Sequence, residues 1–123
     1  MSSARPSARD VALAVVRDVF PPAGSRAIER GAQAALDYRS RKASLSARDT
    51  AFAAELAYGA IKMRRTLDWY LAPFLSSFDS AQDDKKASVV REILRLGVYE
   101  LAYTRADEHA TVFEFVNLAK RYG

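Results

Sequence analysis

The 123-residue chain contains no cysteine and only one histidine, and its five glycines are scattered at positions 24, 31, 59, 97 and 123. The lack of cysteine excludes disulfides, thiolate metal sites and cysteine nucleophiles. Glycines this far apart form no loop that could bring backbone amides against a phosphate. No apolar run approaches the roughly twenty residues of a membrane span, and the N-terminal "MSSARPSARD" lacks the apolar core of a signal peptide. We therefore expect a cytoplasmic protein with no membrane partner.

The few residues with catalytic or metal-binding chemistry are not grouped as an active site would require. His109 follows Asp107 and Glu108, and these three residues are typical of a polar cap at a helix start. Asp83 and Asp84 precede two lysines in a polar stretch, which is typical of solvated charge. We predict no catalytic residue and no metal site in this chain.

The composition suits one compact domain whose partner could be anionic. Half of the residues are hydrophobic (50%), which is enough for one core in a chain of this length. The 19 Lys and Arg against 15 Asp and Glu give a formal net charge of +4. This excess is compatible with a nucleic-acid partner but does not require one.

Apolar residues recur at helical spacing along most of the chain, and the alternation of strands is absent, which predicts an all-α domain of five or six helices. Ser7 with Asp10, and Ser46 with Asp49, are capping patterns that start two of these helices. Another helix should begin at Ser25 and fade into a polar loop, "RSRKAS". The polar stretch "SSFDSAQDDKK" should connect the front helices, about residues 7–74, to the back helices, about 86–122.

The stretch "YGAIKMRRTLDWYL" allows two interpretations. One unbroken helix would align an aromatic and basic stripe suited to stacking on unpaired bases: Tyr58, Lys62, Arg65 and Trp69. A break near Arg65 would instead let Thr66 cap the next helix and turn Trp69 toward the core. The basic cluster would then lie at a helix end, where the helix dipole alone favours cations.

Glu100 is unusual because it falls inside the apolar sector of its helix, between Ile93 and Leu96 in angle. A buried carboxylate needs a partner. We predict a structural role, with Glu100 paired to an arginine or to a capping amide.

Three segments, "YGAIKMRRTLDWYL", "ILRLGVYELAYTRADEHA" and "VNLAKRYG", resemble the NusB-type domain. That domain occurs as the free-standing antitermination factor NusB and as the N-terminal module of the RsmB/Sun (Fmu) family of ribosomal RNA cytosine-5 methyltransferases. The "LDW" and "YTR…HA" elements are closer to the methyltransferase branch. The resemblance covers most of the chain, from "SARDVALAVVRDVF" to the end.

The resemblance implies a single RNA-binding domain over residues 1–123, built as an all-α bundle of two packed three-helix subdomains. It favours the break near Arg65, which makes Asp68 and Trp69 structural residues, with Trp69 in the core. In NusB the N-terminal arm and first helix face RNA, and the matching positions here are Arg5 and Arg9. Charge alone suggests a second RNA patch, made by Lys62, Arg64 and Arg65.

The chain departs from the pattern of the NusB-type domain in three places, the first of which is Asp107, where relatives commonly carry a proline. Phe113 stands where many relatives carry Asn or Ala, so we expect it to contact a final helix that relatives possess, a second copy of the chain, or the front subdomain. Relatives continue beyond the position of Gly123 into that helix, which implies that the chain is a fragment of a longer protein. A homodimer through this side is one consequence.

We therefore expect an RNA-binding module of a 16S ribosomal RNA cytosine-5 methyltransferase. The cysteine nucleophile and the S-adenosylmethionine site of such an enzyme would lie in a separate catalytic domain, so this chain would not itself be an enzyme. The first alternative is an antitermination factor that binds RNA and a ribosomal protein. The second is a structural brace for a catalytic domain without RNA contact. No DNA partner is expected.

Overall fold

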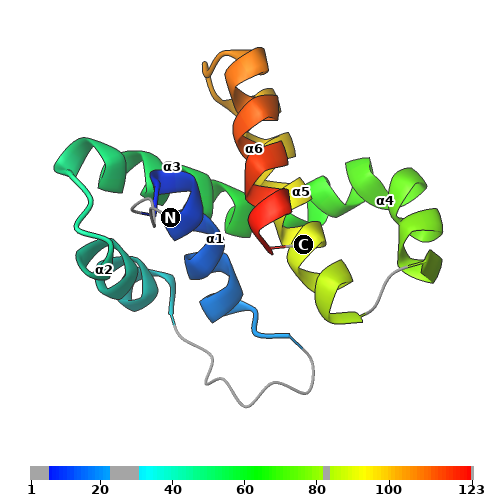
Figure 1. The fold of residues 1–123 in the computed structure, drawn as a ribbon, viewed down its shortest axis with the longest axis horizontal. Helices are drawn as coiled ribbons and strands as arrows, with labels where there is room; N and C mark the ends of the chain where they lie inside the picture. Colours follow the sequence, from blue (N-terminus) through cyan, green and yellow to red (C-terminus); the bar gives the residue numbers. More distant parts are fainter. Residues whose placement is uncertain (1–5, 23–30, 82–83, 123) are drawn as a thin grey trace. The chain divides into compact units, whose positions relative to one another are not determined.

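The computed structural model describes residues 6–22, 31–81 and 84–122, and the side chains of residues 76–86 are outside this description. These residues form six α-helices and no strand: α1 (Ala8–Val19), α2 (Ala32–Lys42), α3 (Ala47–Lys62), α4 (Arg64–Ala81), α5 (Asp84–Tyr103) and α6 (Glu108–Tyr122) (Figure 1). The predicted all-α class is confirmed.

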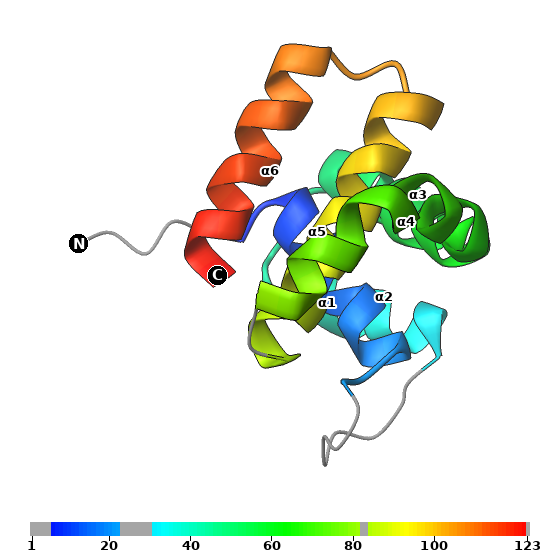
Figure 2. The ribbon, with the colours of Figure 1, turned by 90° about the vertical axis from the view of Figure 1, so that its right-hand side faces the viewer.

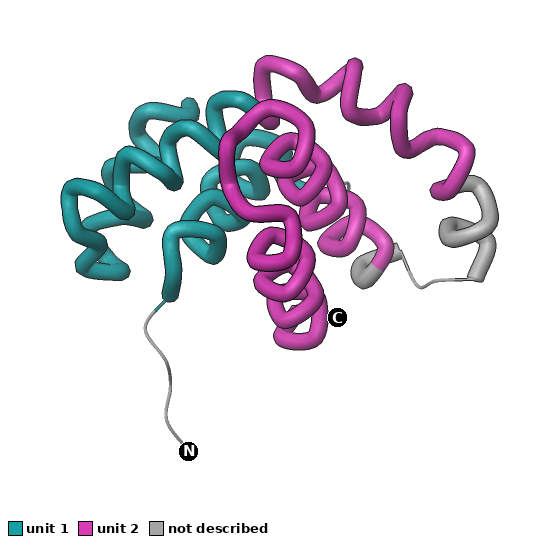
Figure 3. The backbone as a smooth tube through the Cα atoms, turned by 90° about the horizontal axis from the view of Figure 1, so that it is seen from above, with its two compact units in different colours: residues 1–59 teal, residues 60–123 magenta. Residues whose placement is uncertain are grey.

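The chain divides into two compact units, residues 1–59 and residues 60–123 (Figure 3). The boundary falls within α3, and α4, α5 and α6 all belong to the second unit. We expected the division at the polar stretch of residues 76–86. The structure instead makes that stretch largely helical, since α4 continues to Ala81 and α5 begins at Asp84. Serine, aspartate and lysine tolerate helical geometry when packing elsewhere in the helix holds it in place.

The first unit is built on the contact of α1 with α2. α1 begins with the predicted capping box, in which the Ser7 amide donates to Asp10 Oδ2 at 2.8 Å and the Asp10 amide donates to Ser7 Oγ at 3.3 Å. Its buried stripe includes Val11 and Val15. Ala35 and Leu36 are the buried apolar residues of α2.

α2 contradicts the polar loop predicted for "RSRKAS", because the helix continues to Lys42. Two side chains explain this. Ser40 Oγ donates to the Leu36 carbonyl at 2.5 Å, so a buried hydroxyl is satisfied within the helix. Arg39 donates to both carboxylate oxygens of Asp18 in α1, at 2.8 and 2.7 Å, which fixes the last turn of α2. The predicted start at Ser25 lies outside the described residues.

The turn after α2 leads directly into α3. Ser44 has a φ of 55°, a left-handed conformation that ends the helical path. The Asp49 amide then donates to Ser46 Oγ at 3.1 Å, which confirms the second predicted cap.

The second unit is organised around α5, which contacts both α4 and α6. α6 runs back along α5 after a short loop (Figure 2). Buried residues of this unit come from α4, α5 and α6 and include Leu67, Leu71, Ala87, Val89, Ile93, Leu96, Thr111, Phe115 and Leu118. Glu100 in α5 is fully buried, as predicted, and accepts a hydrogen bond from the Thr111 hydroxyl at 2.5 Å.

A network of ion pairs joins α4 to α5. Arg64 donates from both terminal nitrogens to the two carboxylate oxygens of Glu92, each at 2.9 Å. The same carboxylate lies 3.0 Å from Arg95 Nη1, and Arg95 Nε donates to Asp68 at 2.5 Å. The Glu92 side chain is only 6% exposed, so two cations from different helices share one buried anion.

The network raises the pKa of Arg95. Burial by itself would lower the pKa of this guanidinium, but the hydrogen bond to Asp68 and the charge and hydrogen bond of Glu92 outweigh it and raise the pKa above its ordinary value. A raised folded-state pKa means that the stabilisation is complete at neutral pH and is lost only when the pH rises into the strongly alkaline range.

We expect Glu92→Gln to lower the free energy of unfolding by about 2–4 kcal/mol, because it leaves two largely buried guanidinium groups without their shared anion. Chemical denaturation followed by circular dichroism measures this change. The matched control is Glu114→Gln, an exposed glutamate of α6, which should change stability by less than about 0.5 kcal/mol. Equal, small effects of the two substitutions would contradict a stabilising role for the network.

Candidate nucleic-acid interface

Arg9, the described member of the N-terminal pair predicted to contact RNA, lies on α1. Its guanidinium carbon is 5.2 Å from the centroid of the Phe52 ring in α3, a cation–π arrangement that positions the side chain. Arg9 remains half-buried, so part of its surface is accessible to an anion. Arg5 lies outside the described residues.

The three cations predicted as a second patch differ in environment. Lys62, the last residue of α3, and Arg65, in the first turn of α4, are both exposed. Arg64 is half-buried, and its charge is matched by Glu92. An RNA contact by Arg64 stays a prediction, and it would compete with the ion pair that holds α4. Lys62 and Arg65 are therefore the cations of this group that are better placed for a phosphate.

The helix breaks at Met63, close to the predicted position, but the predicted burial of Trp69 is wrong. Trp69 is 72% exposed. The reason lies in the wheel of α4, where Leu67 and Leu71 are buried and one turn apart. Trp69 follows Leu67 by two residues, about 200° around the axis, so it lies on the opposite side. Thr66 does not begin the helix, which already includes Arg64.

A basic and aromatic cluster at the C-terminal end of α2 was missed by the sequence analysis. Tyr38 is 45% exposed, with Arg39 at 5.4 Å and Lys42 at 5.7 Å from its ring centroid. Arg41 in the last turn is exposed as well. The helical spacing of Tyr38 and Lys42 would have identified the cluster had this segment been assigned as helix rather than loop.

Two residues singled out in the sequence lie on α6. His109 is exposed in the first turn, and the cap of this helix comes from Asp107, whose Oδ2 accepts from the Ala110 amide at 3.0 Å. Phe113 is 64% exposed, so in this structure its ring has little cover. Within the described residues, no group of three His, Asp or Glu side chains is arranged to hold a metal ion.

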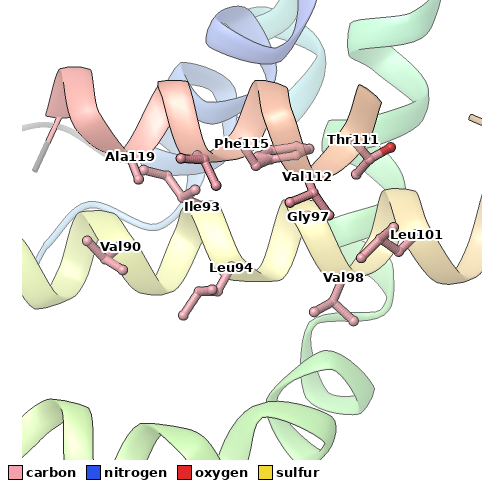
Figure 4. A pocket seen from close by; sticks show the side chains of 11 residues that line it. Val90, Ile93, Leu94, Gly97, Val98, Leu101, Thr111, Val112, Phe115 and Ala119 are labelled. Atoms are coloured by element: carbon pink, nitrogen blue, oxygen red, sulfur yellow. The ribbon is translucent and has the colours of Figure 1, made fainter. Parts of the chain in front are cut away.

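An apolar groove runs along α5 and α6, with a volume of about 250 Å³ (Figure 4). Aliphatic side chains of α5, among them Leu94, Val98 and Leu101, line it together with Val112 and Val116 of α6. Gly97 lies beneath Phe115 at this contact. The groove lacks charged side chains among its lining residues, which suits an apolar occupant and not a phosphate.

The sequence profile of the NusB family matches residues 6–123. The chain belongs to the NusB family. It is 42% identical over 71 residues to the transcription antitermination protein NusB of Macrococcus caseolyticus, an alignment that covers 58% of this chain and 52% of that protein. It is also 40% identical over 96 residues to ribosomal RNA small subunit methyltransferase B of Thermus thermophilus, covering 76% of this chain and 23% of that protein.

A third relative aligns over nearly the whole NusB-family chain. This is the probable ribosomal RNA small subunit methyltransferase B of Synechocystis sp., 30% identical over 118 residues, covering 95% of this chain and 24% of that protein. The chain therefore spans about half the length of its antitermination relatives and about a quarter of these methyltransferase relatives. No solved structure matches the chain significantly. None of the helices in the described part of this NusB-family chain is long and apolar enough to cross a membrane.

We expect Gly97→Ala to raise the free energy of unfolding by up to about 1 kcal/mol. The added methyl group would lie 3.5 Å from Phe115 Cγ, an ordinary van der Waals distance, and alanine is the better helix former. Gly97→Leu should instead lower stability by about 1–3 kcal/mol, because the larger side chain must displace Phe115. Thermal and chemical unfolding measure both changes, and destabilisation by alanine would show that α5 and α6 pack more closely than described.

Proposed function

We propose that this chain is the RNA-binding module of a cytoplasmic S-adenosylmethionine-dependent ribosomal RNA cytosine-5 methyltransferase. The observation that carries the proposal is the extent of similarity. The two small subunit methyltransferase B relatives align over 76% and 95% of the chain, whereas the Macrococcus antitermination relative aligns over 58%. Because the chain has no cysteine, we assign it the binding and orientation of RNA. Nucleophilic attack on the base and binding of the methyl donor would belong to a separate domain.

The charged side chains support RNA contact through phosphates. Arg9 is held over Phe52 with part of its surface accessible, and Lys62 and Arg65 are exposed at the start of the second unit. Arg5 is the fourth candidate for a phosphate contact. Contacts of this kind add affinity and register without reading sequence, and their strength falls as salt rises.

The alternative is an antitermination factor that binds single-stranded RNA together with a ribosomal protein. The 42% identity to the Macrococcus protein, over 52% of that protein's length, favours it. The two functions differ in the RNA that they require. A methyltransferase module should prefer a ribosomal RNA hairpin, and an antitermination factor should prefer an unpaired strand and gain affinity when its ribosomal protein is added.

Fluorescence anisotropy of labelled RNA separates these functions from a purely structural brace. We expect binding to a 16S ribosomal RNA hairpin that is tighter than binding to a scrambled single strand and weakens as salt is raised. Preference for the single strand would favour the antitermination function. Absence of binding to either RNA at low salt would favour the structural brace, which has no RNA contact.

The combined substitution Arg9→Gln and Arg65→Gln should weaken RNA binding several-fold and reduce the slope of log affinity against log salt by about 1–2, because each cation is assigned one phosphate. The matched control pairs Arg105→Gln, an exposed cation of the α5–α6 loop, with Arg48→Gln, an exposed cation in the first turn of α3. It removes the same charge. An equal loss of affinity in both double variants would mean that net charge alone, and not the positions of Arg9 and Arg65, attracts RNA.

A further inference from the structure

The exposed side of α4 carries two large aromatic side chains that the proposed function has not used. Trp69 is 72% exposed and Tyr70 is 49% exposed. Single exposed apolar residues are ordinary, but two adjacent large rings in contact form a patch of the kind that usually contacts a ligand or partner. With Lys62 and Arg65, which precede them, these residues are called here the α4 aromatic surface.

The inner side of α4 explains why these rings remain outside. Leu67 and Leu71 fill the apolar contact, while Arg64 and Asp68 bind Glu92 and Arg95. These four side chains occupy the side of α4 that packs on α5. The rings could reach the core only if the helix rotated and broke both ion pairs.

Because of the same ion pairs, the outer side of α4 carries positive charge. Asp68 is the only acidic residue from Lys62 to Leu75, and its carboxylate binds Arg95. Arg64 is likewise matched by Glu92. The charges left on the α4 aromatic surface are those of Lys62 and Arg65, so the patch is aromatic and positive.

The geometry of the rings suits stacking. Trp69 and Tyr70 meet edge to face, with centroids 5.2 Å apart and planes at 70°, which restrains the indole without covering it. Arg65 lies four residues before Trp69, one helical turn or about 6 Å along the axis. A base on the indole and its own phosphate are separated by a similar span, so one nucleotide could contact both side chains.

We propose that the α4 aromatic surface binds unpaired RNA bases, with Trp69 as the stacking platform and with Lys62 and Arg65 at the adjoining phosphates. The positive flank favours RNA over an apolar protein segment, which would gain nothing from the two cations. This inference rests on the proposed RNA binding and adds a mode of recognition to it. Stacking tolerates any base, so the surface would favour loops and bulges over helical stems without fixing a sequence.

Trp69 is the only tryptophan of the chain, so its fluorescence reports on this surface directly. We expect a 12-nucleotide oligouridylate to quench Trp69 emission, and the quenching to saturate at the same concentration as the anisotropy of the labelled oligonucleotide. Inorganic polyphosphate supplies the charge without bases and should leave the emission unchanged. Binding of oligouridylate without quenching would overturn the inference even if no variant were made.

Trp69→Ala should weaken binding of oligouridylate about tenfold, and Trp69→Phe should retain most of the affinity, because alanine removes the stacking ring and phenylalanine keeps one. Phe113→Ala removes a comparably exposed aromatic ring of α6 and is the matched control, with an expected change of less than twofold. Circular dichroism verifies that each variant is folded, which the exposure of both rings predicts.

The outcomes distinguish this inference from the proposed function. If the wild-type chain binds RNA with salt dependence but Trp69→Ala binds equally well, the inference is wrong and the proposed function stands. In that case the α4 aromatic surface is left for a protein partner. If the wild-type chain binds no RNA, both are wrong.

Discussion

The buried carboxylate of Glu92 is the interaction on which the second unit depends. It accepts two hydrogen bonds from Arg64 and lies 3.0 Å from Arg95, which in turn binds Asp68. Charges removed from water are costly unless they are fully paired. The ion pairs therefore fix the orientation of α4 about its own axis where it packs on α5. This orientation places Leu67 and Leu71 in the core.

The exposed side of α4 follows from the same constraint. Two of its charged residues, Arg64 and Asp68, are held on the inner side, and its largest rings are left outside with Lys62 and Arg65. Residues proposed to contact RNA and residues whose ion pairs stabilise the unit therefore alternate along α4. A change in the ion pairs would therefore alter both stability and the presented surface.

Both units present cations beside aromatic rings, and the second unit adds an apolar groove. In the first unit, Arg9 over Phe52, and Tyr38 beside Arg39 and Lys42, combine cations with aromatic rings. In the second unit, α4 carries the aromatic surface, whereas α5 and α6 enclose an apolar groove without charged lining residues. Polyanions suit the surfaces with cations and rings, and apolar segments suit the groove, so an RNA contact and a protein contact do not compete for the same side chains.

The sequence by itself determined the helical class, the caps at Ser7 and Ser46 and the burial of Glu100, because each depends on spacing within a single helix. The break close to Arg65 was left open by the spacing and was favoured only by the family resemblance. It did not determine the side of α4 that packs inward. That helix has apolar residues on two sides, and only packing against α5 selected Leu67 over Trp69. The pairing of Arg64 with Glu92, 28 residues away, likewise required tertiary structure, since local periodicity says which residues share a face but not what that face meets.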